Sequence, residues 1–172
     1  MKELLERAKK IKLVVFDVDG VLTDGSLFYG DNGEEYKAFY ARDGLGMKLL
    51  MRTGVQIGII TARNSKLVKH RMDSLGIEHL YQGRLDKLAA FDDLIKKLNL
   101  SYEQTAFVGD DVVDLPVMNK VGLSITVNDG HPLVIDKAHW QTPLNGGRGA
   151  ARNVCELIMQ AQNTLDEQLH SF

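Results

Sequence analysis

The sequence predicts an α/β fold in which a doubly wound parallel sheet carries a small β-hairpin flap. Five short apolar runs, of the kind that form strands buried on both faces, alternate with amphipathic segments of helical periodicity. One aromatic-rich segment built around an Asn-Gly pair interrupts this alternation. The 172 residues suit one ordinary domain, and neither an internal repeat nor a Pro/Ser-rich linker divides them. We therefore expect residues 1–172 to form a single domain.

Composition narrows the class of protein. A hydrophobic content of 44% with 26% charged residues is typical of a soluble globular domain, and the net charge of −2 lacks the basic excess of a nucleic-acid-binding protein. The single cysteine, Cys155, excludes an internal disulfide. Residues 1–12 lack the apolar core of a signal peptide, and no apolar run approaches the ~18 residues of a membrane span. We expect a cytoplasmic protein with neither a nucleic acid nor a membrane as partner.

The first quarter of the chain predicts a helix, a strand and the flap. Apolar residues recur at roughly helical spacing over the first ten residues, and the unbroken run 11–16 predicts a fully buried strand. Residues 24–40 predict the hairpin, with its turn at Gly30-Asp31-Asn32-Gly33. Its five aromatic residues exceed what a solvated two-stranded hairpin needs, so we expect it to pack against another subunit.

The remainder alternates helices and strands up to an irregular stretch at 131–149. Glycines 54 and 76 are expected to end two of the helices. The expected strands are 55–60, 79–82, 105–108 and 123–127, and the expected helices are 44–53, 65–75, one around 88–98, 113–119 and 150–168.

Polar side chains follow the ends of the predicted strands. Asp17 and Asp19 end the first strand and can share a face, and such a concentrated negative site is costly unless a cation or a proton neutralises it. Further polar groups follow the other strands: Thr61 with Arg63, Lys87, and Asp110 with Asp111 and Asp114. Ligands bind beyond the carboxyl ends of such strands, and these groups are what phosphoryl transfer with Mg²⁺ and a nucleophilic aspartate requires.

The chain resembles the haloacid dehalogenase-like phosphohydrolases. Four motifs carry the resemblance over about 13–127: Asp17-Val18-Asp19-Gly20, Thr61 after a buried strand, Lys87, and the run 109–114. It implies a Rossmann-like core, with Asp17 as the nucleophile that forms an aspartyl-phosphate and Asp19 as general acid and base. It also implies Mg²⁺ held by the Asp17 carboxylate, the Asp19 backbone carbonyl and Asp110. Thr61 and Lys87 would bind phosphate oxygens, while Asp111 and Asp114 would orient the metal and its waters.

Within that family the chain is similar to small tetrameric members whose hairpin replaces a large cap. The similarity covers nearly the whole chain and rests on residues 16–25, 42–46, 60–63 and the Gly146-Gly147-Arg148-Gly149 run. It implies a homotetramer that hydrolyses 3-deoxy-D-manno-octulosonate 8-phosphate in lipopolysaccharide precursor synthesis. It assigns substrate contacts to Asp19, Tyr40, Ala41, Arg42, Asp43, Gly44, Lys48, Arg63, Arg71 and Lys87. Two anionic groups on one sugar suit forked arginine contacts, and Arg63 and Arg71 are expected to share a face of one helix.

Several alternatives stay open from the residues alone. The substrate could be another sugar acid phosphate, or the chain could be a non-catalytic oligomerisation module of the same fold, which the filled catalytic positions argue against. If the order of the motifs is set aside, Lys87 is expected to be a solvated helix residue. Arg71 could equally be a surface charge, and Asp114 could equally be an acidic residue in the first turn of a helix. The glycine-rich run is either a flexible link or a means of bringing Arg148 to an active site, its own or a neighbour's.

Overall fold

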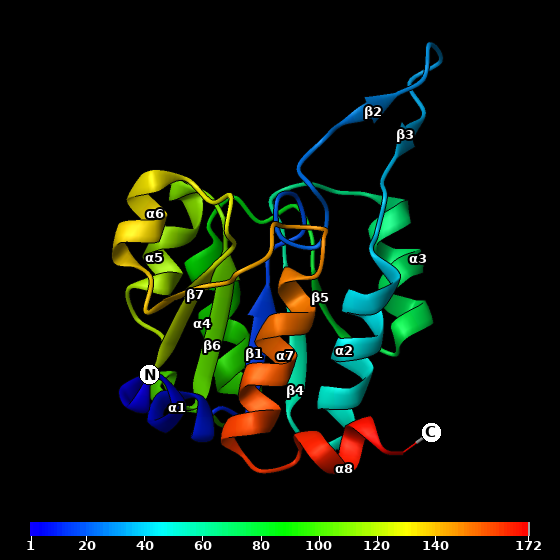
Figure 1. Ribbon diagram of the computed structural model, residues 1–172. Coiled ribbons are helices and arrows are strands. Elements are labelled where there is room, and N and C mark those ends of the chain that lie inside the picture. The colour runs from blue at the N-terminus through cyan, green and yellow to red at the C-terminus, as the bar shows by residue number, and fades with distance from the viewer. Residues whose placement is uncertain (172) are drawn as a thin grey trace.

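The computed structural model, which describes residues 1–171, has a six-stranded parallel sheet between two layers of helices (Figure 1). The strand order is β5-β4-β1-β6-β7-β8, so β1 lies in the interior between β4 and β6. The strands are β1 Leu13–Phe16, β4 Gln56–Ile60, β5 His79–Tyr81, β6 Thr105–Gly109, β7 Leu123–Thr126 and β8 Trp140–Gln141. This confirms the predicted doubly wound parallel sheet.

Each face of the sheet has its own apolar core. Side chains that alternate along β1 enter the two cores, with Val14 and Phe16 in one and Leu13 and Val15 in the other. One core packs against α1 Lys2–Lys9, α2 Ala41–Arg52, α3 Lys66–Leu75, α7 Ala150–Ala161 and α8 Leu165–Leu169. The other packs against α4 Lys87–Lys97, α5 Leu115–Met118 and α6 Pro132–Lys137. Burial on both faces explains why β1 is an unbroken apolar run.

The hairpin projects beyond the carboxyl edge of the sheet (Figure 1). Its strands, β2 Phe28–Tyr29 and β3 Glu35–Tyr36, pair antiparallel around the expected turn, where Gly33 has a φ of +85°. Phe28, Tyr29 and Tyr36 are exposed, whereas Phe39 packs against the core that contains Val14 and Phe16. The flap is therefore small and carries an apolar surface.

Three expectations about element boundaries were wrong. Helix α2 begins at residue 41 rather than 44, because Gly44 and Gly46 lie inside it against arginine side chains of other helices. Helix α3 begins at Lys66, so Arg63 lies in the preceding loop and not on one helix with Arg71. The expected last helix is two helices, separated where Asn163 has a φ of +58°.

The irregular stretch 131–149 contains two elements that the pattern did not predict. Helix α6 contributes Val134 to a core, and β8 adds a sixth parallel strand beside β7. A helix of six residues and a strand of two are too short to show a period in sequence. Within residues 1–171, no helix is long and apolar enough to cross a membrane.

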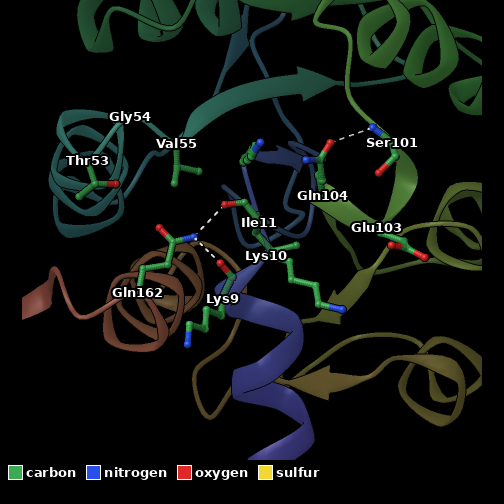
Figure 2. A pocket seen from close by; sticks show the side chains of 11 residues that line it. Lys9, Lys10, Ile11, Thr53, Gly54, Val55, Ser101, Glu103, Gln104 and Gln162 are labelled. Atoms are coloured by element: carbon green, nitrogen blue, oxygen red, sulfur yellow. Dashed lines mark hydrogen bonds between the residues drawn. The ribbon is translucent and has the colours of Figure 1, made fainter.

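A pocket of about 740 Å³ lies at the end of the sheet remote from the flap (Figure 2). Its lining comes from segments that precede β1, β4 and β6, together with Gln162, which donates to the backbone carbonyls of Lys9 and Ile11. Ligands of doubly wound sheets bind at the opposite, carboxyl end of the strands. The lining contains no paired carboxylates, so this pocket does not have the chemistry expected of the site.

Candidate active site

Three adjacent strands bring the predicted catalytic residues together. Asp17 follows β1, Thr61 follows β4 and Asp110 follows β6, and β1 pairs with both of the other strands. Thr61 is buried, and its hydroxyl accepts a hydrogen bond from the Arg63 backbone N–H at 3.4 Å. Parallel pairing therefore turns separate sequence motifs into one cluster at the carboxyl edge.

Asp17 is held firmly at the centre of this cluster. Its Oδ1 accepts from the Val18 backbone N–H at 2.7 Å, and its Oδ2 lies 3.0 Å from the Lys87 ammonium. Burial raises the pKa of the Asp17 carboxyl from its ordinary 3.8 to about 7, with the Asp114 carboxylate adding to the effect and Lys87 opposing it. The Asp17 carboxylate thus needs positive charge nearby in order to stay ionised.

Lys87 connects the Asp17 and Asp114 carboxylates. It begins α4, its side chain is only 2% exposed, and its Nζ donates to Asp114 Oδ1 at 2.7 Å. Burial by itself would lower the pKa of Lys87, but the charges of Asp17 and Asp114 outweigh it and raise the pKa. Lys87 is therefore a buried, charged lysine between two carboxylates rather than a solvated helix residue.

Asp110 completes an acidic cluster suited to a divalent cation. Carboxylate oxygens of Asp17, Asp110 and Asp114 all lie within 4.8 Å of one another. Burial raises the pKa of Asp110 to about 7, and the neighbouring carboxylates of Asp17, Asp114 and Asp111 add to it. Oxygen-rich, negatively charged sites of this kind fit Mg²⁺, which would relieve the repulsion.

Asp114 has its oxygens already engaged. Oδ1 accepts from Lys87, and Oδ2 accepts from the backbone N–H groups of Asp110 and Asp111 at 3.0 and 3.3 Å. It therefore orients the residues around it, and of the three carboxylates those of Asp17 and Asp110 are the more available to a cation. The exposed Asp111 accepts from the Val112 N–H at 2.7 Å and so caps the 3₁₀ turn Val112–Asp114.

The glycine-rich run packs closely under the loop that follows β1. A Cβ atom on Gly146 would lie 1.8 Å from the Gly20 carbonyl oxygen, and the Gly147 N–H donates to the Val21 carbonyl at 2.9 Å. The exposed Arg148 lies 3.3 Å from Asp24 of the same loop. In this chain the run is a docked support rather than a flexible link.

The Asp19 carboxylate contacts the flap. It contacts the Lys37 ammonium, and its Oδ2 lies 3.8 Å from Arg63 Nε. Arg63 in turn donates to Glu35 Oε1 at 2.9 Å and to the Tyr29 hydroxyl at 2.5 Å. Lys37 and Glu35 were not predicted as site residues from the sequence, although their spacing of two in an extended segment places them on one face.

The expected substrate-binding stretch 40–44 forms the first turn of α2. Tyr40 is the N-cap residue, while Ala41, Arg42 and the nearby Lys48 are exposed. Arg71 of α3 lies beside this turn: its Nη2 donates to the Tyr40 carbonyl at 3.5 Å, and its guanidinium lies over the Phe39 ring. A Cβ atom on Gly44 would lie 2.3 Å from Arg71 Nη2, so only glycine allows this approach.

Asp43 is buried, unlike Ala41 and Arg42, which precede it in the same turn. Its carboxylate accepts from the Arg152 N–H at 2.8 Å and the Gly149 N–H at 3.4 Å, which are unsatisfied donors at the start of α7. Burial raises the pKa of Asp43, and these backbone donors oppose the shift. Asp43, a residue of α2, therefore caps the N-terminus of α7.

The chain is similar in sequence to known hydrolases. The family model of haloacid dehalogenase-like hydrolases matches residues 79–153. The chain is 51% identical over 165 residues to the 3-deoxy-D-manno-octulosonate 8-phosphate phosphatase KdsC of Escherichia coli, with 96% of this chain and 88% of that protein covered.

Solved structures give the same result. The phosphatase of this name from Yersinia pestis is 49% identical with a TM-score of 0.94, covering 95% of this chain and 89% of that one. The phosphatase from Moraxella catarrhalis, solved with magnesium, phosphate and a KDO molecule, is 43% identical with a TM-score of 0.98, covering 100% and 99%. The chain belongs to the 3-deoxy-D-manno-octulosonate 8-phosphate phosphatase family of haloacid dehalogenase-like hydrolases.

Proposed function

We propose that this protein is a Mg²⁺-dependent phosphomonoesterase that converts 3-deoxy-D-manno-octulosonate 8-phosphate into the free sugar acid and phosphate. The observation that carries the proposal is the group formed by buried Asp17, Lys87 and Asp114 and half-buried Asp110 at the carboxyl edge of the sheet. A relative of the same fold was solved with magnesium, phosphate and the sugar acid. The product would enter lipopolysaccharide precursor synthesis.

The reaction begins with attack by an Asp17 carboxylate oxygen on phosphorus. The bond from phosphorus to the sugar oxygen breaks, and Asp19 gives its proton to that oxygen. Water then attacks the aspartyl-phosphate, its proton passes to Asp19, and the bond from phosphorus to Asp17 breaks to release phosphate. Lys87 and Thr61 bind the phosphoryl oxygens throughout.

The Asp17 carboxylate, the Asp19 backbone carbonyl and Asp110 would hold Mg²⁺. When bound, the ion supplies positive charge that offsets the negative charge of the phosphoryl group and of the acidic cluster. Lys87 has a separate part, because it keeps Asp17 ionised and turned toward phosphorus through the 3.0 Å contact. Asp114 fixes Lys87 from the opposite side.

The sugar acid carboxylate would be recognised beside the flap. Arg63 and Arg71 supply guanidinium groups, and the first turn of α2, with its exposed Arg42, and the exposed Lys48 supply further polar contacts. Asp43 supports that turn by capping α7. A phosphatase for another sugar acid phosphate would use the same groups with a different fit to the sugar hydroxyls.

We also propose a cytoplasmic homotetramer. Leu27, Phe28, Tyr29 and Tyr36 leave an apolar hairpin surface exposed, which a neighbouring subunit would cover. The only cysteine, Cys155, is buried, which suits a reducing compartment. A monomer in light scattering would contradict the assembly.

The decisive experiment compares wild-type protein with Asp17→Asn. We expect Mg²⁺-dependent phosphate release from 3-deoxy-D-manno-octulosonate 8-phosphate by the wild type and none by the variant, because an amide does not form the acyl phosphate. Full activity in Asp17→Asn would contradict the mechanism. Equal turnover of sugar phosphates that lack the carboxylate would contradict the substrate but leave the phosphatase reaction intact.

A further inference from the structure

Lys37 is a buried cation that the catalytic motifs do not include. It follows β3 on the return strand of the hairpin, and its side chain is only 1% exposed. Its ammonium contacts Asp19 Oδ1 and lies 3.5 Å from Glu35 Oε1. A lysine is seldom so deeply buried unless it is paired, and here both partners are carboxylates.

Glu35 links Lys37 to Arg63. The same oxygen, Glu35 Oε1, lies 2.9 Å from Arg63 Nη2 and 3.5 Å from Lys37 Nζ. The two oxygens of Asp19 are divided between the two cations, with Oδ1 toward Lys37 and Oδ2 toward Arg63. Two acidic and two basic side chains thus alternate in a closed arrangement, and two of the four members belong to the flap.

Asp19 differs from Asp17 in how it is oriented. The Asp17 carboxylate is fixed by the Val18 N–H and by Lys87, and neither of these residues belongs to the flap. The Asp19 carboxylate contacts Lys37 closely, while Arg63 Nε lies at the looser distance of 3.8 Å. A side chain that must first give and then take a proton needs a defined position relative to the ester oxygen.

We propose that Lys37 is a positioning residue for catalysis: from the flap, it holds the Asp19 carboxylate in the orientation for proton transfer. This inference rests on the proposed function. A side chain that is 1% exposed is not open to substrate, so Lys37 acts through Asp19 and Glu35 rather than by binding the sugar phosphate. The flap thereby contributes to the chemical step as well as to the shape of the site.

The leaving group provides the test. The sugar alkoxide must be protonated as it departs, whereas the nitrophenolate of p-nitrophenyl phosphate departs without a proton. Lys37→Met is therefore expected to slow first-turnover release of the sugar by about tenfold or more and that of nitrophenolate by less than about twofold. The KM for the sugar phosphate should change much less than kcat. Lys96→Met, on the exposed surface of α4, serves as the matched control.

A second measurement separates positioning from general damage. In an Asp19→Asn background, Lys37→Met should cause little further loss, because the residue through which it acts is already disabled. Equal loss with both substrates, no loss with either, or additive losses in the double variant would overturn the inference. If Lys37→Met does not fold, Lys37→Gln is judged by the same criteria. Wild-type protein inactive on the sugar phosphate would instead contradict the proposed function.

Discussion

Gly20 lies so close to Asp110 that a Cβ atom on Gly20 would be 2.1 Å from Asp110 Oδ2. The loop after β1 therefore touches the carboxylate that we assign to Mg²⁺. Gly20 also has a φ of +88°, a conformation that side-chain-bearing residues rarely adopt. The close approach and the backbone conformation each require glycine at this position.

Gly20→Ala is expected to displace the Asp110 carboxylate and weaken Mg²⁺ binding. The apparent Mg²⁺ affinity and kcat should both fall by about tenfold or more, since displaced metal ligands and reacting groups are costly to catalysis. Phosphate release measured against Mg²⁺ concentration gives both values. The matched control is Gly25→Ala, because Gly25 has a similar φ of +79° but a Cβ there would have no neighbour closer than 3.6 Å. Equal losses in the two variants would show that backbone strain alone is responsible.

Asp43→Ala is expected to lower the free energy of unfolding by about 1–2 kcal/mol, because it removes the acceptor for two backbone donors at the start of α7. Asp43→Asn keeps an acceptor oxygen and should cost less. Urea denaturation at fixed pH measures both, with Asp73→Ala on the exposed face of α3 as the control. If Asp43→Ala were as stable as the wild type, the capping role would be wrong.

Lys87→Met is expected to leave the buried Asp17 and Asp114 carboxylates without their shared cation. Removing one partner of a buried ion pair typically costs about 3–5 kcal/mol, and Mg²⁺ should restore part of it. Thermal unfolding with and without Mg²⁺ measures the effect, and inhibition by inorganic phosphate should weaken in parallel. Lys96→Met on the exposed surface of α4 should change neither value. A variant that retains full stability without Mg²⁺ would contradict the paired arrangement.

Stabilisation by Mg²⁺ should increase with pH. In the metal-free protein, burial raises the pKa values of Asp17 and Asp110 from 3.8 to about 7, so the folded state binds protons more tightly than the unfolded state between these values. Stability is therefore lost as pH rises through this window, where the carboxylates must ionise. Mg²⁺ replaces those protons, so its effect on Tm should be small near about pH 5 and large near about pH 8.

A matched variant checks the source of that pH dependence. Asp110→Asn removes one of the two acids and should reduce both the pH-dependent loss of stability and the gain on adding Mg²⁺. Thermal unfolding at several pH values gives both quantities. A Mg²⁺ effect that is the same at low and high pH would contradict the assignment of the raised pKa values.

Elements with a clear hydrophobic pattern in the sequence were predicted, whereas two of the shortest elements were not. Buried strands such as Leu13–Phe16 are unbroken apolar runs because both faces of the sheet are covered, so they were recognised from sequence. The two-residue strand β8 and the helix α6 are too short to show a period, and the Asn163 break depends on one backbone conformation. These elements form because the rest of the fold holds them in place.

The sequence by itself determined that Asp17, Thr61 and Asp110 follow buried strands, and parallel pairing of those strands then brings the three together. Only the tertiary structure decided that Asp43 caps α7, that the glycine-rich run supports the Gly20 loop, and that Lys37 reaches Asp19. The physical reason is the separation of the interacting residues along the chain. The residues next to it in sequence show that a residue lies at a strand end. A contact between the flap or a helix terminus and a distant carboxylate, by contrast, forms only when the chain has folded.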